Sequence, residues 1–224
     1  VIKHLPEEYL TENKDEDDYI KVAVIGKPNV GKSSLVNRII GEDRMIVSNI
    51  AGTTRDATDS FVENDHGKFM FIDTAGLRRK NKIKEELERY MIVRTVSAVE
   101  RADVVVLVID ASEGVTEQDA KIAGIAHDRG KAVVIAVNKW DAVEKDNNSV
   151  KKYTEKIRQI LSFMPYAEIL FISAKSGQRL HKIFETIDVV IENNSMRVAT
   201  GVLNEIVAEA VAMQQPPTDK GKRL

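Results

Sequence analysis

A glycine-rich turn joins a strand pattern to a helix pattern near the start of this chain. The stretch IKVAVIGKPNVGKS joins an apolar, β-branched run directly to Gly26-x4-Gly31-Lys32-Ser33, and a helical pattern follows over residues 32–40. Backbone N–H groups of such a turn surround phosphates, a lysine at this position reaches the β- and γ-phosphates, and the next hydroxyl binds Mg²⁺. The pattern therefore predicts a phosphate-binding loop for a nucleoside triphosphate.

Length and composition favour one main soluble domain with at most a small appendage. The 224 residues are enough for one hydrophobic core, and 43% hydrophobic with 30% charged residues is typical of a globular protein. The longest apolar runs, at residues 104–109 and 132–137, are too short to cross a bilayer. The chain has no cysteine, which excludes thiolate metal sites, and its formal net charge of −2 excludes a surface suited as a whole to nucleic acid. We expect a cytoplasmic protein.

Strand patterns and helix patterns alternate along the chain. Apolar runs rich in Val, Ile and Phe predict buried strands at residues 22–25, 68–72, 104–109, 132–137 and 168–172. Helical patterns lie at residues 32–40, 85–100, 116–129, 150–164, 180–192 and 200–214. Thr116 and Ser149 are expected to cap two of these helices. Residues 57–63 read as the first arm of a hairpin, so we predict an α/β fold with a mostly parallel, doubly wound sheet and one antiparallel edge strand.

The motif Asp73-Thr74-Ala75-Gly76 follows the second strand pattern. In open α/β sheets, ligands bind beyond the carboxyl ends of the strands. A carboxylate there can hold Mg²⁺ through water, and the Gly76 N–H can bind a γ-phosphate. The alternative is a loop in which Asp73 only caps a turn.

The motif Asn138-Lys139-Trp140-Asp141 closes another strand pattern and predicts the base. The Asp141 carboxylate can accept hydrogen bonds from N1–H and N2–H₂ of guanine, whereas adenine has no such pair of donors. We expect Asn138 to fix the loop and reach the base N7, Lys139 to lie over the ring and Trp140 to pack internally. The alternative is a charged loop that caps the next helix.

Two weaker signals complete the set. Ser173-Ala174-Lys175 ends the last strand pattern, where the Ala174 N–H can bind the guanine O6. Thr54 lies between the first helix and the hairpin, in a loop that can bring a hydroxyl to Mg²⁺ when a γ-phosphate is present. A plain threonine-rich loop is the alternative for Thr54.

These motifs stand in the order found in guanine-nucleotide-binding domains, and the chain resembles the second G domain of the Der/EngA family of tandem ribosome-assembly GTPases. The resemblance is carried by GKPNVGKSSLVNRI, VSNIAGTTRD, DTAGLRRK, ADVVVLVIDASEGVTEQDAKIAG and VNKWDAVEKD. It implies a P-loop GTPase G domain at residues 19–194, a linker from a missing upstream G domain at residues 1–18, and a helix with the start of a missing KH-like domain at residues 195–224. It also implies that the full-length protein acts on the large ribosomal subunit and its rRNA, without a membrane.

The resemblance implies GTP or GDP as ligand, with Mg²⁺ and a stimulating K⁺. Related GTPases ligate K⁺ at the position of Asn29, here with carbonyls of residues 48–51, although Asn29 can equally stabilise a turn after Pro28. Leu77 stands where many GTPases carry a glutamine that orients water. The main alternative is therefore a guanine-nucleotide-sensing docking module with negligible hydrolysis. A third interpretation is the G domain of a tRNA-modification GTPase or of a membrane iron-transport GTPase. The first would normally carry a catalytic cysteine tail and the second membrane spans, and neither is in this sequence.

Together the motifs predict the residues of one site. The expected nucleotide-binding residues are Gly26, Lys27, Pro28, Asn29, Val30, Gly31, Lys32, Ser33, Ser34, Thr54, Asp73, Thr74, Ala75, Gly76, Asn138, Lys139, Asp141, Ser173, Ala174 and Lys175. The expected Mg²⁺ ligands are Ser33, Thr54 and Asp73, and the expected K⁺ ligand is Asn29. Catalysis is expected to rest on positioning and charge neutralisation by Lys32, Thr54, Gly76 and Asn29.

Overall fold

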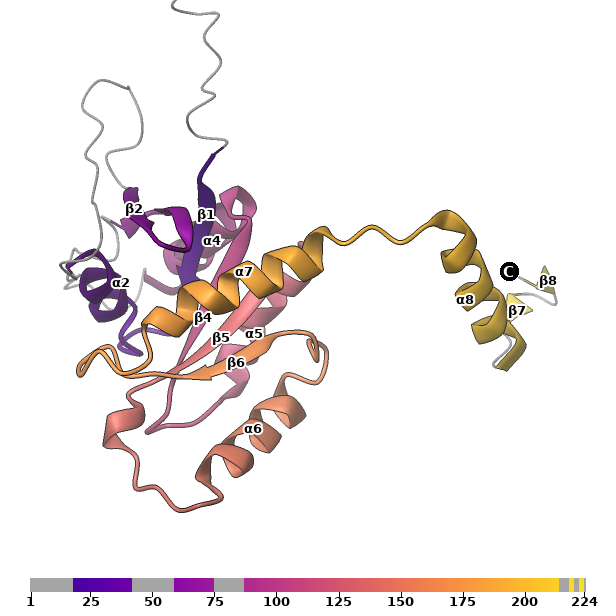
Figure 1. Cartoon of the computed structure of the whole chain (residues 1–224). Helices are drawn as coiled ribbons and strands as arrows, with labels where there is room; N and C mark the ends of the chain where they lie inside the picture. The colour runs from indigo at the N-terminus through magenta and orange to yellow at the C-terminus, as the bar shows by residue number, and fades with distance from the viewer. Residues whose placement is uncertain (1–17, 42–58, 75–86, 214–217, 220–221, 224) are drawn as a thin grey trace, which may run out of the picture. The chain divides into compact units, whose positions relative to one another are not determined.

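The apolar runs of the sequence pair into one six-stranded sheet in the computed structural model (Figure 1). The structure describes residues 18–41, 59–74, 87–213, 218–219 and 222–223. Strand order is β2-β3-β1-β4-β5-β6, and all neighbours are parallel except the hairpin of β2 and β3, as predicted. The strands are β1 Ile20–Ile25, β2 Ser60–Asn64, β3 Gly67–Phe71, β4 Val104–Asp110, β5 Ala132–Asn138 and β6 Glu168–Phe171.

Both faces of the sheet are covered, which explains why its central strands are apolar without interruption. All seven residues of β4 are buried, and alternate ones enter opposite cores. Leu107 and Ile109 pack into one core, whereas Val106 and Val108 pack into the other. Because successive side chains of a strand point to opposite faces of the sheet, β4 contributes apolar side chains to both cores.

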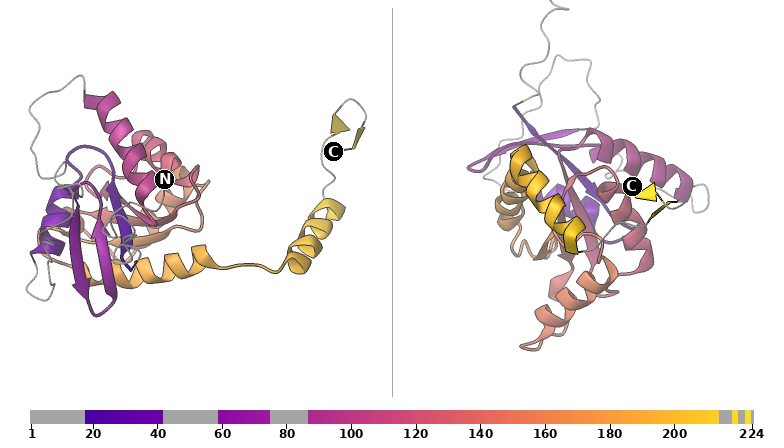
Figure 2. Two further views of the ribbon diagram at one scale, coloured as in Figure 1. Left: turned by 90° about the horizontal axis from the view of Figure 1, so that it is seen from above. Right: turned by 90° about the vertical axis from the view of Figure 1, so that its right-hand side faces the viewer.

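The helices alternate with the strands and lie on both faces of the sheet (Figures 1 and 2). The core that contains Val106 receives the apolar sides of α2 and α7, and the core that contains Leu107 receives those of α4, α5 and α6. This is the doubly wound arrangement that the sequence predicts. The helices are α2 Lys32–Ile40, α4 Leu87–Arg101, α5 Glu117–His127, α6 Ser149–Ile160 and α7 His181–Ser195, with a short 3₁₀ helix η3 Trp140–Ala142.

Two helix starts test the predicted caps. Thr116 caps α5 as predicted: its side chain accepts from the N–H of Asp119, whose carboxylate accepts from the N–H of Thr116. Ser149 is not the cap of α6, because Asn148 holds that position without a side-chain hydrogen bond. The Ser149 hydroxyl instead bonds to Asp146, at 2.8 Å from its Oδ1.

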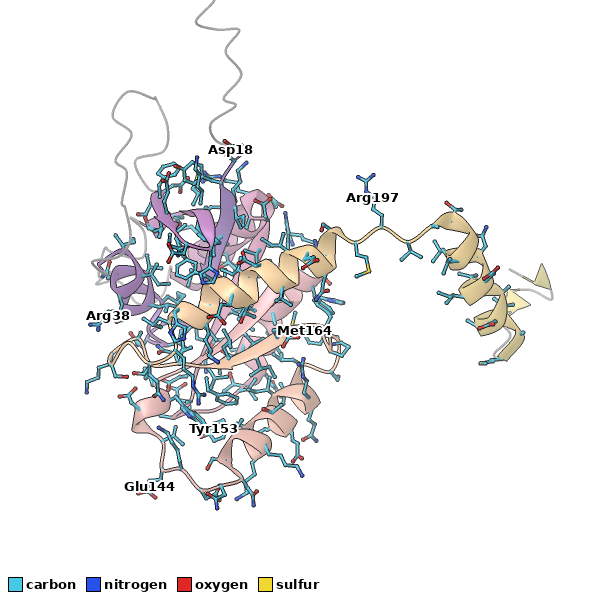
Figure 3. All side chains as sticks on the ribbon, viewed as in Figure 1. Asp18, Arg38, Glu144, Tyr153, Met164 and Arg197 are labelled. Carbon is cyan, nitrogen blue, oxygen red and sulfur yellow. The ribbon has the colours of Figure 1, made fainter. Side chains whose placement is uncertain are left out.

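Helix α6 also ends four residues earlier than predicted, at Ile160 rather than residue 164. The chain turns there and buries Leu161 and Met164, which are 1% and 0% exposed (Figure 3, where Met164 is labelled). Pro165 follows directly, and a proline disfavours helical backbone in the residue before it. Tertiary packing therefore ends the helix although its apolar spacing continues.

The chain divides into two units, residues 1–194 and 195–224. The second contains α8 Thr200–Met213, close to the predicted helix, and the antiparallel two-residue strands β7 Thr218–Asp219 and β8 Lys222–Arg223. In the described part of the chain, no helix combines the length and the apolar character needed to cross a membrane.

Candidate nucleotide-binding site

Loops from distant parts of the sequence meet at the carboxyl edge of the sheet. The phosphate loop follows β1, Asp73 lies beyond β3, Asn138 ends β5 and Ser173 follows β6. The buried amide of Asn138 joins three of these loops, since its Nδ2 donates to Val30 O at 2.8 Å and its Oδ1 accepts from Ala174 N at 2.9 Å. The structure therefore brings the predicted phosphate, base and Ser-Ala-Lys motifs together.

The backbone of the phosphate loop requires its two glycines. Gly26 has φ +142°, and a side-chain carbon there would lie 2.4 Å from the carbonyl oxygen of Val108. Gly31 has φ +100°, and a side-chain carbon there would lie 2.3 Å from Nδ2 of Asn138. Asn29 is exposed at the tip of the loop with φ +64°. Only glycine fits the first two positions without displacing a neighbour.

The start of α2 is open to an anion, whereas the start of α5 is not. At α2, Gly31 provides no side-chain cap, and the first helical turn contains no acidic residue. At α5, Thr116 and Asp119 form a capping box, and Glu117 adds a second carboxylate to the first turn. Free N–H groups and the positive end of the helix dipole favour phosphate. Of these two helix starts, the structure thus makes α2 the one suited to phosphate.

The side chain of Lys32 is bound by backbone carbonyl groups of the phosphate loop. Its Nζ donates to the carbonyl oxygens of Gly26 at 2.7 Å and Lys27 at 2.5 Å. Burial lowers the pKa of Lys32 to about 8, against the opposing effect of the negative charge of Asp119. The ammonium group is therefore placed where the loop would receive the β- and γ-phosphates.

A pocket of about 410 Å³ lies beside the loop and fits the predicted base position. A hydrogen bond from the Ser173 side chain holds the pKa of Asp141 below its ordinary value, and the charges of Lys175 and Lys145 add to this effect. The Asp141 carboxylate is therefore ionised and able to accept two hydrogen bonds. The pocket is lined by Gly31, Ser34, Asn138, Lys139, Asp141, Ala142, Ala174 and Lys175.

Trp140 packs internally, as predicted, and anchors the base loop. It is 3% exposed and contacts the rings of Tyr153 and Phe171 at centroid distances of 5.1 and 4.5 Å (Figure 3, where Tyr153 is labelled). The backbone N–H of Trp140 donates to Ile172 O at 3.1 Å, which ties the base loop to the end of β6. The aromatic contacts thus fix the 3₁₀ helix that carries Asp141.

The side chain of Lys27 points to α5 instead of the nucleotide pocket. Its Nζ lies 3.1 Å from Glu113 Oε2, 3.2 Å from Thr116 Oγ1 and 3.3 Å from Asp119 Oδ2. Burial alone would lower the pKa of Lys27, but the Glu113 hydrogen bond and the charge of Asp119 outweigh it and raise that pKa. Only the Lys27 backbone remains for phosphate binding. Neither Glu113 nor Asp119 belongs to a predicted motif, although the Thr116-x-x-Asp119 spacing marks a helix cap.

Asp73 lies at the predicted edge, but its carboxylate is bound by Arg94, which belongs to no predicted motif. Arg94 of α4 contacts both carboxylate oxygens, with Nε 3.0 Å from Oδ2 and Nη2 2.5 Å from Oδ1. The Asp73 N–H donates to Asp59 Oδ1 at 2.7 Å. The carboxylate of Asp73 and the hydroxyl of Ser33 are the oxygen ligands that Mg²⁺ prefers, so they fit the metal. Mg²⁺ would compete with Arg94 for Asp73.

Several predicted features are placed differently or lie outside the described residues. The Thr74 hydroxyl is buried and lies 2.7 Å from Oγ of Ser60, the first residue of β2, and Thr74 is not among the residues that line the pocket beside the base. The described part of the chain does not include several predicted site residues, namely Thr54, Ala75, Gly76, Leu77 and the carbonyls of residues 48–51. It does not include residues 1–17 of the predicted linker either.

Comparisons with known proteins agree with this geometry. Residues 21–139 match the model of the family described as 50S ribosome-binding GTPases. The protein GTPase Der of Agathobacter rectalis is 76% identical over 100% of this chain and 50% of its own length. The chain thus spans about half the length of the curated relatives it matches.

Solved structures of Era share the fold. Era in complex with MgGDPNP and nucleotides 1506–1542 of 16S ribosomal RNA is 30% identical, with a TM-score of 0.57 over 75% of this chain and 56% of that one. A variant of Aquifex aeolicus Era bound to GDP·AlF₄⁻ is 27% identical, with a TM-score of 0.56 over 88% of this chain and 67% of that one.

Proposed function

This chain belongs to the family of 50S ribosome-binding GTPases, and from that premise we propose that it binds GTP and GDP with Mg²⁺, hydrolyses GTP and uses the γ-phosphate to order a switch region. The observation that carries the proposal is that the Asn138 side chain donates a hydrogen bond to Val30 O of the phosphate loop and accepts one from Ala174 N. These bonds support a single site in which phosphates and base are bound by loops from different strands.

Each end of the nucleotide has its own set of groups. Lys32 and the N–H groups at the start of α2 bind the phosphates, while Asp141 accepts from N1–H and N2–H₂ of guanine. Ser33 and Asp73, with Thr54, would hold Mg²⁺, which when bound neutralises charge on the phosphates. Lys139 lines the pocket beside the base.

K⁺ stimulation is part of the proposal and depends on Asn29. The exposed Asn29 side chain at the loop tip offers a carbonyl oxygen, as a K⁺ ligand requires. Leu77 cannot orient an attacking water, so a cation that neutralises the phosphates would have to supply much of the rate. Because Leu77 cannot orient water, it also favours the second candidate function, a guanine-nucleotide sensor with negligible hydrolysis.

The relatives support a proposal for the role of the full-length protein. We propose that residues 1–18 link this G domain to an upstream one and that residues 195–224 lead into a KH-like domain. The full-length protein would then act in the cytoplasm in assembly of the large ribosomal subunit, with contacts to its rRNA. The match to the family of 50S ribosome-binding GTPases and the 76% identity to a GTPase Der support this proposal.

Single-turnover GTP hydrolysis by the full chain in KCl and in NaCl tests the function. We expect GDP and GTP, but not ATP, to bind by calorimetry, and phosphate release to be faster in KCl. The Asn29→Gly variant is the control, because glycine tolerates the φ of +64° and removes the side chain with its carbonyl oxygen, so the advantage of KCl should disappear. Guanine binding without release in either salt would leave only the sensor, and failure to bind guanine nucleotides would contradict both functions.

A further inference from the structure

Asp110, the last residue of β4, is a buried carboxylate with no role in the motifs described so far. It is 2% exposed, and its Oδ1 accepts from the N–H and hydroxyl of Ser112 at 2.9 and 2.6 Å. Its Oδ2 accepts from Nζ of Lys139. Burial alone would raise the pKa of Asp110, but the hydrogen bonds from Lys139 and Ser112 outweigh it and lower that pKa. Asp110 is thus an ionised group whose two oxygens are both occupied.

Lys139, the partner of Asp110, has an unusual backbone conformation. Its φ is +61°, in the left-handed region that a lysine adopts only when its surroundings hold it there. Lys139 is the residue directly before the 3₁₀ helix that carries Asp141. The dihedral angles of Lys139 therefore determine the direction of the backbone after β5, and with it the position of Asp141.

The sheet gives Asp110 a fixed position from which to act. Asp110 pairs in register with Asn138 across β4 and β5, and Ala111 N donates to Asn138 O at 2.8 Å. The pocket is lined by Lys139 and Asp141 but not by Asp110. The contact of the Asp110 carboxylate with a pocket residue is its bond to Lys139.

We propose that Asp110 is a positioning residue for guanine selectivity, which holds the left-handed turn at Lys139 and thereby aims Asp141 at the amino edge of the base. This inference rests on the proposed nucleotide-binding function. It concerns selectivity between purines and not the binding of phosphates, which lie at the other end of the site.

The affinities of the full chain for GDP and inosine diphosphate test this role. Inosine lacks the 2-amino group, so the affinity ratio reports the hydrogen bond between that group and Asp141, about tenfold or more in the unmodified chain. In Asp110→Asn we expect the ratio to fall roughly fivefold, because the left-handed turn loses its partner. An equal loss for both nucleotides, or an unchanged ratio, would show that Asp110 is structural only. An unmodified chain that does not prefer GDP would contradict the proposed function instead.

Two matched variants separate this route from others. Asp103→Asn makes the same change in an exposed carboxylate just before β4, where Asp103 Oδ2 accepts from Lys21 N at 2.8 Å, and should leave the ratio unchanged. Glycine adopts positive φ without strain, so in a Lys139→Gly background Asp110→Asn should have no further effect on the ratio. A further fivefold fall in that background would overturn the proposal.

A second substitution keeps the test valid if Asp110→Asn does not fold. Lys139→Gln keeps much of the side-chain stem and loses the charge that Asp110 binds, so it should lower the ratio in the same way. Lys139→Arg keeps the charge and should preserve most of the ratio. Equal ratios in these two variants would contradict the role of the ion pair.

Discussion

Asn138 connects three loops through groups that are all buried. Asn138 is 2% exposed, and its partners Val30 and Ala174 are 1% and 5% exposed. A buried amide that satisfies both a carbonyl and an N–H leaves two orphaned groups when it is removed. The same residue therefore matters both for folding of the site and for its binding geometry.

Asn138→Ala should lower the free energy of unfolding by about 2–4 kcal/mol, because Val30 O and Ala174 N lose their partner. Urea unfolding of the nucleotide-free chain measures this change. Asn148→Ala is the matched control, since Asn148 is exposed and makes no side-chain capping bond, and it should change stability by about 0.5 kcal/mol or less. A similar effect of both substitutions would argue against Asn138 as the link.

At the residue level, the sequence predicts groups that belong to a short motif and misses groups that meet only in three dimensions. Asn138 and Asp141 are identified because they follow a strand in a recognisable spacing. Asp110 also ends a strand, and the same rule would have identified it. Arg94, 21 positions from Asp73, gives no such signal in the sequence.

At the scale of elements, Lys27 connects the phosphate loop to the start of α5. The side chains of Lys27 and Asp119 are 8% and 0% exposed, and Asp119 Oδ1 has no hydrogen-bond partner among the described residues. Glu113, the other acidic partner, is 61% exposed. A buried ion pair is costly to break because one charge is left without compensation.

Lys27→Met should therefore lower the free energy of unfolding by about 3–5 kcal/mol. Glu113→Gln removes an exposed partner of the same ammonium and should cost about 1 kcal/mol or less. Because the pKa of Lys27 is raised, this stabilisation is complete below about pH 10 and lost as the pH rises above it. Urea unfolding at neutral pH gives both values, and a larger cost for Glu113→Gln would refute the buried pair as the main contact.

Elements in the buried sheet are predicted better than helix ends. Parallel strands covered on both faces must be apolar throughout, so runs such as β4 and β5 stand out in the sequence. Helix ends depend on local competition for hydrogen bonds. Ser149 bonds to Asp146 instead of capping α6, and Leu161, the residue after the end of α6, is buried in the core.

At the scale of the whole molecule, the order of motifs along the chain predicts the fold, since a strand–loop–helix repeat with motifs at strand ends leads to one doubly wound sheet. The family match over residues 21–139 and the Era structures agree with that architecture. The sequence does not predict the contacts that tie the loops to α4 and α5, because those depend on side chains from separate elements.

The proposed function requires that one guanine nucleotide spans the phosphate loop and Asp141. Calorimetric titration of Asp141→Asn with GDP and xanthosine diphosphate tests it most directly. An amide donates where the carboxylate accepted, so it matches the 2-carbonyl of xanthine and not the 2-amino group of guanine. We predict that GDP binding weakens by about a hundredfold or more while the xanthine nucleotide becomes the tighter ligand. Unchanged preference for GDP in this variant would show that Asp141 does not bind the base.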